Sequence, residues 1–312
     1  MESFIIALEA VIPIFIPIIT GVLVRRFDWL TEQGISDANR LCFRLFMPTL
    51  LFNNIYSADL RLSEVKSLFV VCLLIVVMEF IFGFAFSKMM VDDTKKRSVL
   101  IQGFFRTNIV AMGLPLIQHL SNDVGTTKMA ILITFFVPVF VILSVLLLEG
   151  LGRQGKKASE LALTIAKNPL IIGALLAIVL RTIGIKLPIF ITNCIADYSK
   201  TGATLILVLL GTSLRISSIQ SNKRLIVSFT GLKLFLLPIM FLVIAVLLKY
   251  RGSDLACILI LVGCPVATSV YNMTEQMGGD AELAGELVAI SSMISSVSLL
   301  FLIYLLKLCQ LI

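Results

Sequence analysis

Two apolar stretches of this 312-residue chain contain polar residues and helix breakers that a simple lipid-facing helix lacks. The first, residues 98–120, contains Arg106, Asn108, Gly113 and Pro115. Asn108 lies roughly 15 Å in from the start of this stretch, near the centre of a ~30 Å hydrocarbon layer. Polar or irregular backbone at that depth is tolerated only where it is buried in protein or lines a watery cavity. The pattern predicts an interrupted helix that forms part of a binding site.

The second stretch, residues 255–276, contains Pro265 at about the same depth. Proline removes a backbone donor and obstructs the carbonyl four residues back, and the small residues after it let another backbone approach. Where two such helices cross, the freed N–H groups and the positive ends of the half-helix dipoles favour a carboxylate. Asn108 would supply a neutral donor there, and Thr107 and Ser269 would add hydroxyls.

The composition indicates the class of protein to which these stretches belong. The chain is 58% hydrophobic and 14% charged, with a mean hydropathy of +1.03. Soluble domains are closer to a quarter charged, so we predict an all-α polytopic membrane protein. The net charge of +7 is assigned to short loops, and no nucleic-acid partner is expected. The six cysteines lie in apolar segments without metal-site spacing, so no metal or cofactor is expected.

Ten spans organise the chain. We place them at 5–24, 37–57, 66–88, 98–120, 128–149, 161–182, 189–213, 224–248, 255–276 and 282–309. The N-terminus lacks a cationic region and a cleavage site, so it is expected to begin a permanent span. With both termini outside, the inner loops carry more lysine and arginine than the outer loops. We therefore expect an integral protein of the plasma membrane, which in bacteria is the cytoplasmic membrane.

Ten spans also suggest a duplication of five, inverted in the membrane. The first span ends at Arg25 and the sixth at Arg181, in similar apolar contexts. This offset of 156 residues carries Asn108 to about Cys264, beside Pro265, so that two breaks meet at the midplane. A rival offset of 150 residues would place one break near the outer surface, and depth favours the first. The predicted repeats are residues 1–156 and 157–312.

At this point a family resemblance becomes visible. The segment from Arg106 to Leu116 resembles the N-x-x-x-x-G-[IL]-P-L motif of the auxin efflux carrier family, which includes plant PIN carriers and bacterial malate and malonate permeases. Residues 265–280 resemble the family's ninth-span motif, in which a proline opens a run that ends in a small-residue, acidic turn. Asp197 and the Ser291-Ser292 pair also look like family positions.

The resemblance implies the fold shared with bile-acid symporters and sodium/proton antiporters, in which broken helices 4 and 9 cross. It implies a scaffold, often dimeric, from residues 1–57 and 161–215, and a moving transport domain from residues 66–151 and 223–312. Substrate would bind at the crossing. The expected substrate-binding residues are Arg106, Thr107, Asn108, Ile109, Pro265, Val266, Ala267 and Ser269, and the expected structural residues are Gly113, Pro115, Gly263 and Tyr271.

The chain departs from the family at Thr107 and at Tyr271-Asn272, and it lacks the long central loop of many plant carriers. A small mono- or dicarboxylate, such as malate or malonate, is therefore expected rather than auxin.

Several charged residues inside the predicted spans allow two interpretations each. Arg106 would clamp a second carboxylate or pair structurally with Glu79 or Glu286. Both glutamates must be paired, protonated or functional at their depth, and either would serve a coupling ion, H⁺ or Na⁺. Asp197 would lie at an outer entrance or in a scaffold ion pair. Lys233 would be a pathway cation or an internal counter-ion.

Three function classes remain to be compared. The first is a secondary active or facilitative transporter that moves small organic anions by elevator-like alternating access, as a homodimer in lipid. An intramembrane enzyme would need a catalytic set at depth, and neither H-E-x-x-H nor G-x-S-x-G occurs, so no enzyme is expected. The third class, a non-transporting sensor or an uncoupled channel with the same fold, stays open on sequence alone.

Overall fold

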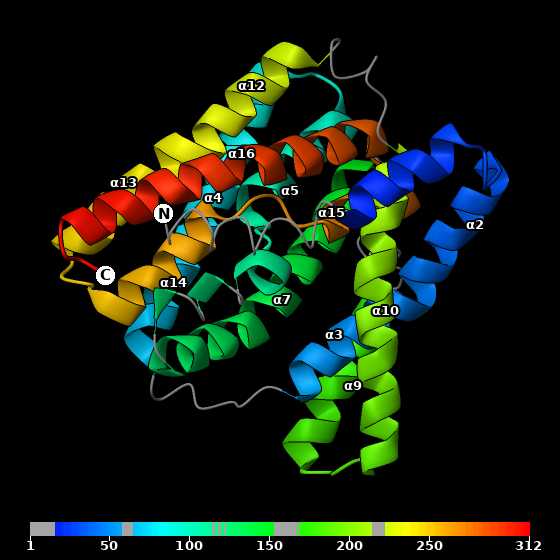
Figure 1. The fold of residues 1–312 in the computed structure, drawn as a ribbon, viewed down its shortest axis with the longest axis horizontal. Helices are drawn as coiled ribbons and strands as arrows, with labels where there is room; N and C mark the ends of the chain where they lie inside the picture. Colours follow the sequence, from blue (N-terminus) through cyan, green and yellow to red (C-terminus); the bar gives the residue numbers. More distant parts are fainter. Residues whose placement is uncertain are drawn as a thin grey trace.

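The computed structural model describes residues 16–57, 65–113, 116–117, 120–121, 123–152, 167, 169–213 and 222–312. Within these residues every regular element is helical, and the only extended pairing is an isolated bridge between Thr107 and Val266. The predicted all-helical class is therefore confirmed (Figure 1).

The helices follow one another along the chain with three short π-helical segments (η) among them. Residues 16–26 are helical. They are followed by α2 (Glu32–Leu41), η1 (Cys42–Phe46), α3 (Met47–Tyr56), α4 (Lys66–Met90), α5 (Thr94–Phe105), η3 (Ile109–Gly113), α7 (Asp123–Gly152), α9 (Pro169–Ile183), α10 (Ile189–Ser213), α12 (Lys223–Gly231), η4 (Leu232–Leu236), α13 (Leu237–Leu247), α14 (Gly252–Gly263), α15 (Ser269–Gln276) and α16 (Ala281–Leu308).

Polar capping residues set several helix starts. The Thr31 hydroxyl accepts a hydrogen bond from the Gly34 amide at 3.0 Å, so α2 begins at Glu32. The expected start of this helix at residue 37 was therefore too late, because a cap satisfies the first free N–H groups in a polar segment as well as in an apolar one. In the same way Asp93 accepts from the Lys95 amide at 2.9 Å at the start of α5.

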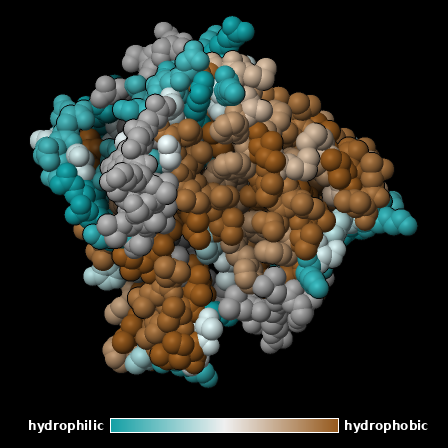
Figure 2. All heavy atoms as spheres, turned by 180° about the vertical axis from the view of Figure 1, so that it is seen from behind, coloured by the Kyte–Doolittle hydropathy of each residue, from teal (hydrophilic) through white to brown (hydrophobic). Residues whose placement is uncertain are grey.

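Within the part of the chain that the structure describes, five helical runs are long and apolar enough to cross a membrane. They are Lys66–Met90, Val124–Leu151, Ile189–Thr212, Lys223–Leu247 and Ala281–Leu308. Helices α5 and α14 each have only 12 residues, or ~18 Å, because each stops where its span is interrupted. Figure 2 shows a broad hydrophobic face, as expected where side chains contact lipid. An integral membrane protein is supported, whereas the ten-span inverted repeat stays a prediction.

The helices form two groups in Figure 1. Helix α3 packs against α9 and α10 in one group, and α4 against α5, α13 against α14 and α15 against α16 in the other. The largest cluster of buried apolar side chains lies in the second group, mainly in α4, α5, α7, α12–α14 and α16. A smaller cluster joins α7 to η1, α9 and α10. The division into a scaffold and a transport domain stays a prediction.

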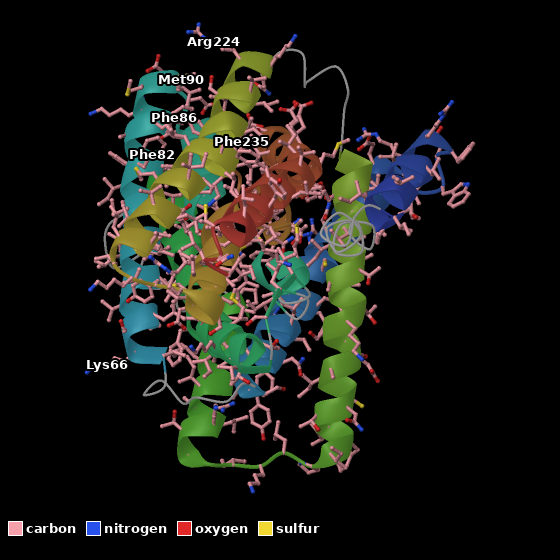
Figure 3. The ribbon with its side chains drawn as sticks, turned by 60° about the vertical axis from the view of Figure 1, so that its left-hand side comes forward. Lys66, Phe82, Phe86, Met90, Arg224 and Phe235 are labelled. Carbon is pink, nitrogen blue, oxygen red and sulfur yellow. The ribbon has the colours of Figure 1, made fainter. Side chains whose placement is uncertain are left out.

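Basic residues gather at one end of the second group. In Figure 3, Lys66 and Met90 mark opposite ends of α4, and Arg224 of α12 lies at the Met90 end. At this end Lys96 Nζ donates to Asn222 Oδ1 at 3.1 Å. The placing of this end on the inner side of the membrane stays a prediction.

Candidate functional site

The two interrupted helices meet at their breaks. Helix α5 ends at Phe105 and α14 ends at Gly263, and the unwound residues that follow run antiparallel to each other. The Asn108 amide donates to the Pro265 carbonyl at 2.8 Å, and the Ala267 amide donates to the Arg106 carbonyl at 2.9 Å. We call residues 106–108 and 264–268 the crossover. Most of the predicted binding residues are thus brought together, from positions more than 150 residues apart in the chain.

Beyond the crossover, both chains resume helical structure. Ile109 opens η3 and Ser269 opens α15. Among the described residues, the amides of Thr268 and Ser269 have no hydrogen-bond acceptor. They lie at the start of α15, which is the positive end of its dipole. The crossover therefore presents unused N–H donors, as the sequence predicted.

Neighbouring helices hold the crossover in place. The Val266 amide donates to Ser291 Oγ of α16 at 3.1 Å, so one residue of the predicted serine pair anchors the strand-like segment. A Cβ at Gly113 would lie 2.6 Å from Ile260 Cγ2, and one at Gly263 would lie 2.9 Å from Leu299 Cδ2. Both glycines thus allow close packing against neighbouring side chains, and the structural role expected for them stays a prediction.

The other two residues of the predicted structural set are Tyr271 and Pro115. Tyr271 is buried in α15, in the largest apolar cluster. Pro115 lies outside the described residues.

A cavity of about 280 Å³ lies beside the crossover. This volume is near the small end of the ~300–1,000 Å³ range of ligand pockets. One wall comes from the crossover and the residues around it, the second from α7, and the third from α3 and α10. Its lining is Met47, Leu50, Arg106, Thr107, Asn108, Ile109, Val110, Val137, Phe140, Val141, Ala203, Thr204, Ile206, Leu207, Ala267, Thr268 and Ser269. Among the described lining residues Arg106 is the one charged residue, and it contributes a positive charge.

Arg106 is buried at the edge of this cavity, with 3% of its surface exposed. Its Nη2 donates to Ser269 Oγ at 2.9 Å, and its Nη1 lies 2.6 Å from Met273 Sδ. No carboxylate among the described residues pairs with it. The interpretation that pairs Arg106 with Glu79 or Glu286 is therefore wrong for this structure, because Glu79 bonds another cation, Lys233, and Glu286 accepts from Asn222 Nδ2 at 3.0 Å.

Lys233 of η4 is an internal counter-ion. It is fully buried, as is Glu79 of α4, and its Nζ donates to Glu79 Oε1 at 2.7 Å. Nζ also donates to the Phe104 carbonyl and, at 3.2 Å, to Thr107 Oγ1. A cation at the last carbonyls of α5 is favourable because that end of the dipole is negative. Lys233 thus joins α4, α5 and the crossover, and does not line the cavity.

The remaining charged candidates lie away from the cavity. Asp197 is exposed on α10 and has no ion pair among the described residues. Glu286 is buried on α16 near Asn222, and neither it nor Glu79 lines the cavity.

Sequence reasoning missed two contacts near the site. One is Met273, whose sulfur faces the Arg106 guanidinium one helical turn after Ser269. The other is the hydrogen bond from Asn272 Nδ2 of α15 to Asn39 Oδ1 of α2, at 3.0 Å between two fully buried side chains. For the second contact, the signal available in the sequence was an asparagine in each of two polar helix segments.

Two comparisons with known proteins each match nearly the whole chain. A family model described as a membrane transport protein matches residues 6–303. An uncharacterized transporter from Methanothermobacter thermautotrophicus is 22% identical over 293 residues, which cover 93% of this chain and 95% of that protein.

Proposed function

Because the chain belongs to the membrane transport protein family, the auxin efflux carrier family of the sequence analysis, we propose that it is a secondary transporter of small organic anions. The substrate class is a mono- or dicarboxylate such as malate or malonate. Its carboxylate binds at the crossover of α5 and α14.

The observation that carries this proposal is the chemistry of the cavity wall. The wall offers the guanidinium of Arg106, the amides of Thr268 and Ser269 and the side chain of Asn108, and none of its described residues carries a carboxylate. Donors of this kind favour an anion, and those at a helix start are reinforced by the dipole. The opposite walls are apolar apart from Thr204, so a small organic anion is a better fit than a hydrated inorganic ion.

The position of the cavity supports alternating access. It lies between the crossover and a wall made by α3 and α10, which belong to the other group of helices. In the proposed elevator movement, the transport domain carries the intact crossover past this wall. Substrate would then reach either side of the plasma membrane without the crossover hydrogen bonds having to break.

Two parts of the proposal, the oligomeric state and the coupling ion, rest on the family resemblance and on charge. The scaffold is proposed to form a homodimer in the lipid bilayer, and H⁺ or Na⁺ is the proposed coupling ion where transport is active. In this proposal Glu79 takes part in ion coupling only through its ion pair with Lys233. Asp197 and Glu286 would act outside the cavity. A non-transporting sensor or an uncoupled channel is the alternative function.

Counterflow in proteoliposomes tests the proposal. Vesicles loaded with unlabelled malate should accumulate labelled malate, with malonate, lactate and indole-3-acetate as competitors. Asn108→Ala should reduce binding by about 10- to 100-fold, because one buried donor contributes ~1–3 kcal/mol. Asn193→Ala is the matched control, since Asn193 is exposed on α10 and does not line the cavity.

Exchange in the wild type and in Asn193→Ala, lost in Asn108→Ala, would support a carrier with its site at the crossover. Binding without exchange would favour the sensor, and exchange that persists in Asn108→Ala would place the site elsewhere.

A further inference from the structure

We infer that Arg106 forms a second anion subsite, which makes the carrier selective for dicarboxylates over monocarboxylates of the same length. The inference rests on the proposed function, because it concerns the same cavity. It goes beyond that function by assigning the second carboxylate to one residue.

The first argument is the balance of charge around Arg106. Among the described residues its guanidinium contacts only a hydroxyl and a thioether, although it carries five N–H donors. A buried cation that faces neutral groups alone is unfavourable unless an anion compensates it. Lys233, the other cation buried beside the crossover, has its carboxylate in Glu79. Arg106 has no carboxylate partner among the described residues, and it borders the cavity.

The second argument is the position of the guanidinium relative to α15. Its Nη2 contacts Ser269, the first residue of that helix, and its Nη1 faces Met273 one turn later. A positive side chain at the positive end of a helix dipole is repelled. The amides of Thr268 and Ser269, at the start of the same helix, have no acceptor among the described residues. Guanidinium, amides and dipole are all satisfied together by one carboxylate.

The third argument is the spacing of two subsites. Arg106 and Asn108 belong to the same unwound segment, in which alternate residues are ~6.6 Å apart. A short dicarboxylate can therefore place one carboxylate near Asn108 and the other near Arg106. The guanidinium can bind a carboxylate through two parallel hydrogen bonds, which a lysine cannot do. A monocarboxylate would leave one of the two subsites empty.

The test measures the selectivity ratio, defined as the Kd of a monocarboxylate divided by that of the dicarboxylate of equal length. The pairs are butyrate with succinate and propionate with malonate, measured by calorimetry on purified protein in lipid nanodiscs. In Arg106→Gln the ratio should fall about 30-fold, or ~2 kcal/mol at ~1.4 kcal/mol per tenfold. Arg44→Gln is the control for net charge: Arg44 is exposed on η1 and lies outside the cavity, so this ratio should not change.

Arg106→Lys keeps the positive charge, and it provides a second test if the glutamine variant does not fold. Its ratio should fall about fivefold, because an ammonium lacks the paired donors. If the folded variants bind both acids as the wild type does, or bind both more weakly by the same factor, the selectivity ratio is unchanged. Either result would overturn the inference and leave the proposed function standing. If the wild type binds none of the four acids, then the proposed function fails and the inference fails with it.

Discussion

Removing one partner of the buried ion pair between Lys233 and Glu79 should strongly destabilise the crossover. Both side chains are fully buried and the charged atoms are 2.7 Å apart. At an effective dielectric constant of ~20, this distance corresponds to an attraction of about 6 kcal/mol, most of which offsets the cost of removing two charges from water. The pair as a whole is therefore close to neutral for folding, whereas either charge alone is strongly unfavourable.

The perturbation is a double-mutant cycle with Lys233→Met and Glu79→Gln. Lys233→Met leaves a buried carboxylate without its cation and removes the donor to the Phe104 carbonyl and to Thr107 Oγ1. It should reduce the free energy of unfolding by about 3–5 kcal/mol. The double variant should recover at least ~2 kcal/mol of this loss, because it no longer contains an isolated charge.

Unfolding in mixed micelles, titrated with SDS and followed by circular dichroism, measures all four proteins of the cycle. Lys128→Met is the matched control, because Lys128 also pairs with a carboxylate at 2.6 Å, on Asp254, but is partly exposed. Its loss should cost about 1 kcal/mol or less. The reasoning is refuted if the double variant is no more stable than Lys233→Met, or if the two lysine variants lose the same stability.

Two further predictions concern packing. Gly211→Leu should prevent folding, or lower the yield of monodisperse protein severalfold in size-exclusion chromatography, because a Cβ at Gly211 would overlap the Ile18 carbonyl where the first helix crosses α10. Gly150→Leu is the control, since no neighbour lies within 4 Å of a Cβ at that position. Equal yields of the two variants would contradict the close crossing of the helices. Ser291→Ala should lower the free energy of unfolding by about 1–3 kcal/mol in the same SDS titration, because the buried Val266 amide loses its acceptor. An unchanged free energy of unfolding would mean that another group replaces the hydroxyl.

Local patterns made much of the fold predictable. Apolar runs of membrane length predicted helices in the right parts of the chain, because the bilayer requires every backbone group to be bonded within a helix. Proline, glycine and buried polar residues marked the interruptions at Arg106 to Asn108 and near Pro265. The start of α2 was misplaced because a polar helix has no hydropathy signal.

The partners of the charged residues were beyond the reach of the sequence. Arg106, Glu79 and Lys233 all lie in apolar segments at plausible depths, and their spacing along the chain allowed several pairings. The structure pairs Glu79 with Lys233, 154 positions apart, and leaves Arg106 at the cavity. Side-chain pairing depends on how helices are rotated and shifted against one another, which hydropathy does not encode.

The sequence by itself therefore determined that this is a helical membrane protein with two broken helices, because membrane solvation and backbone hydrogen bonding act on each segment locally. Only the tertiary structure decided that the breaks pair through Thr107 and Val266, that a small cavity opens beside them and that Arg106 is the one charged residue among its described lining. These features arise from contacts between residues far apart in the chain, whose energies depend on distances of a few ångströms.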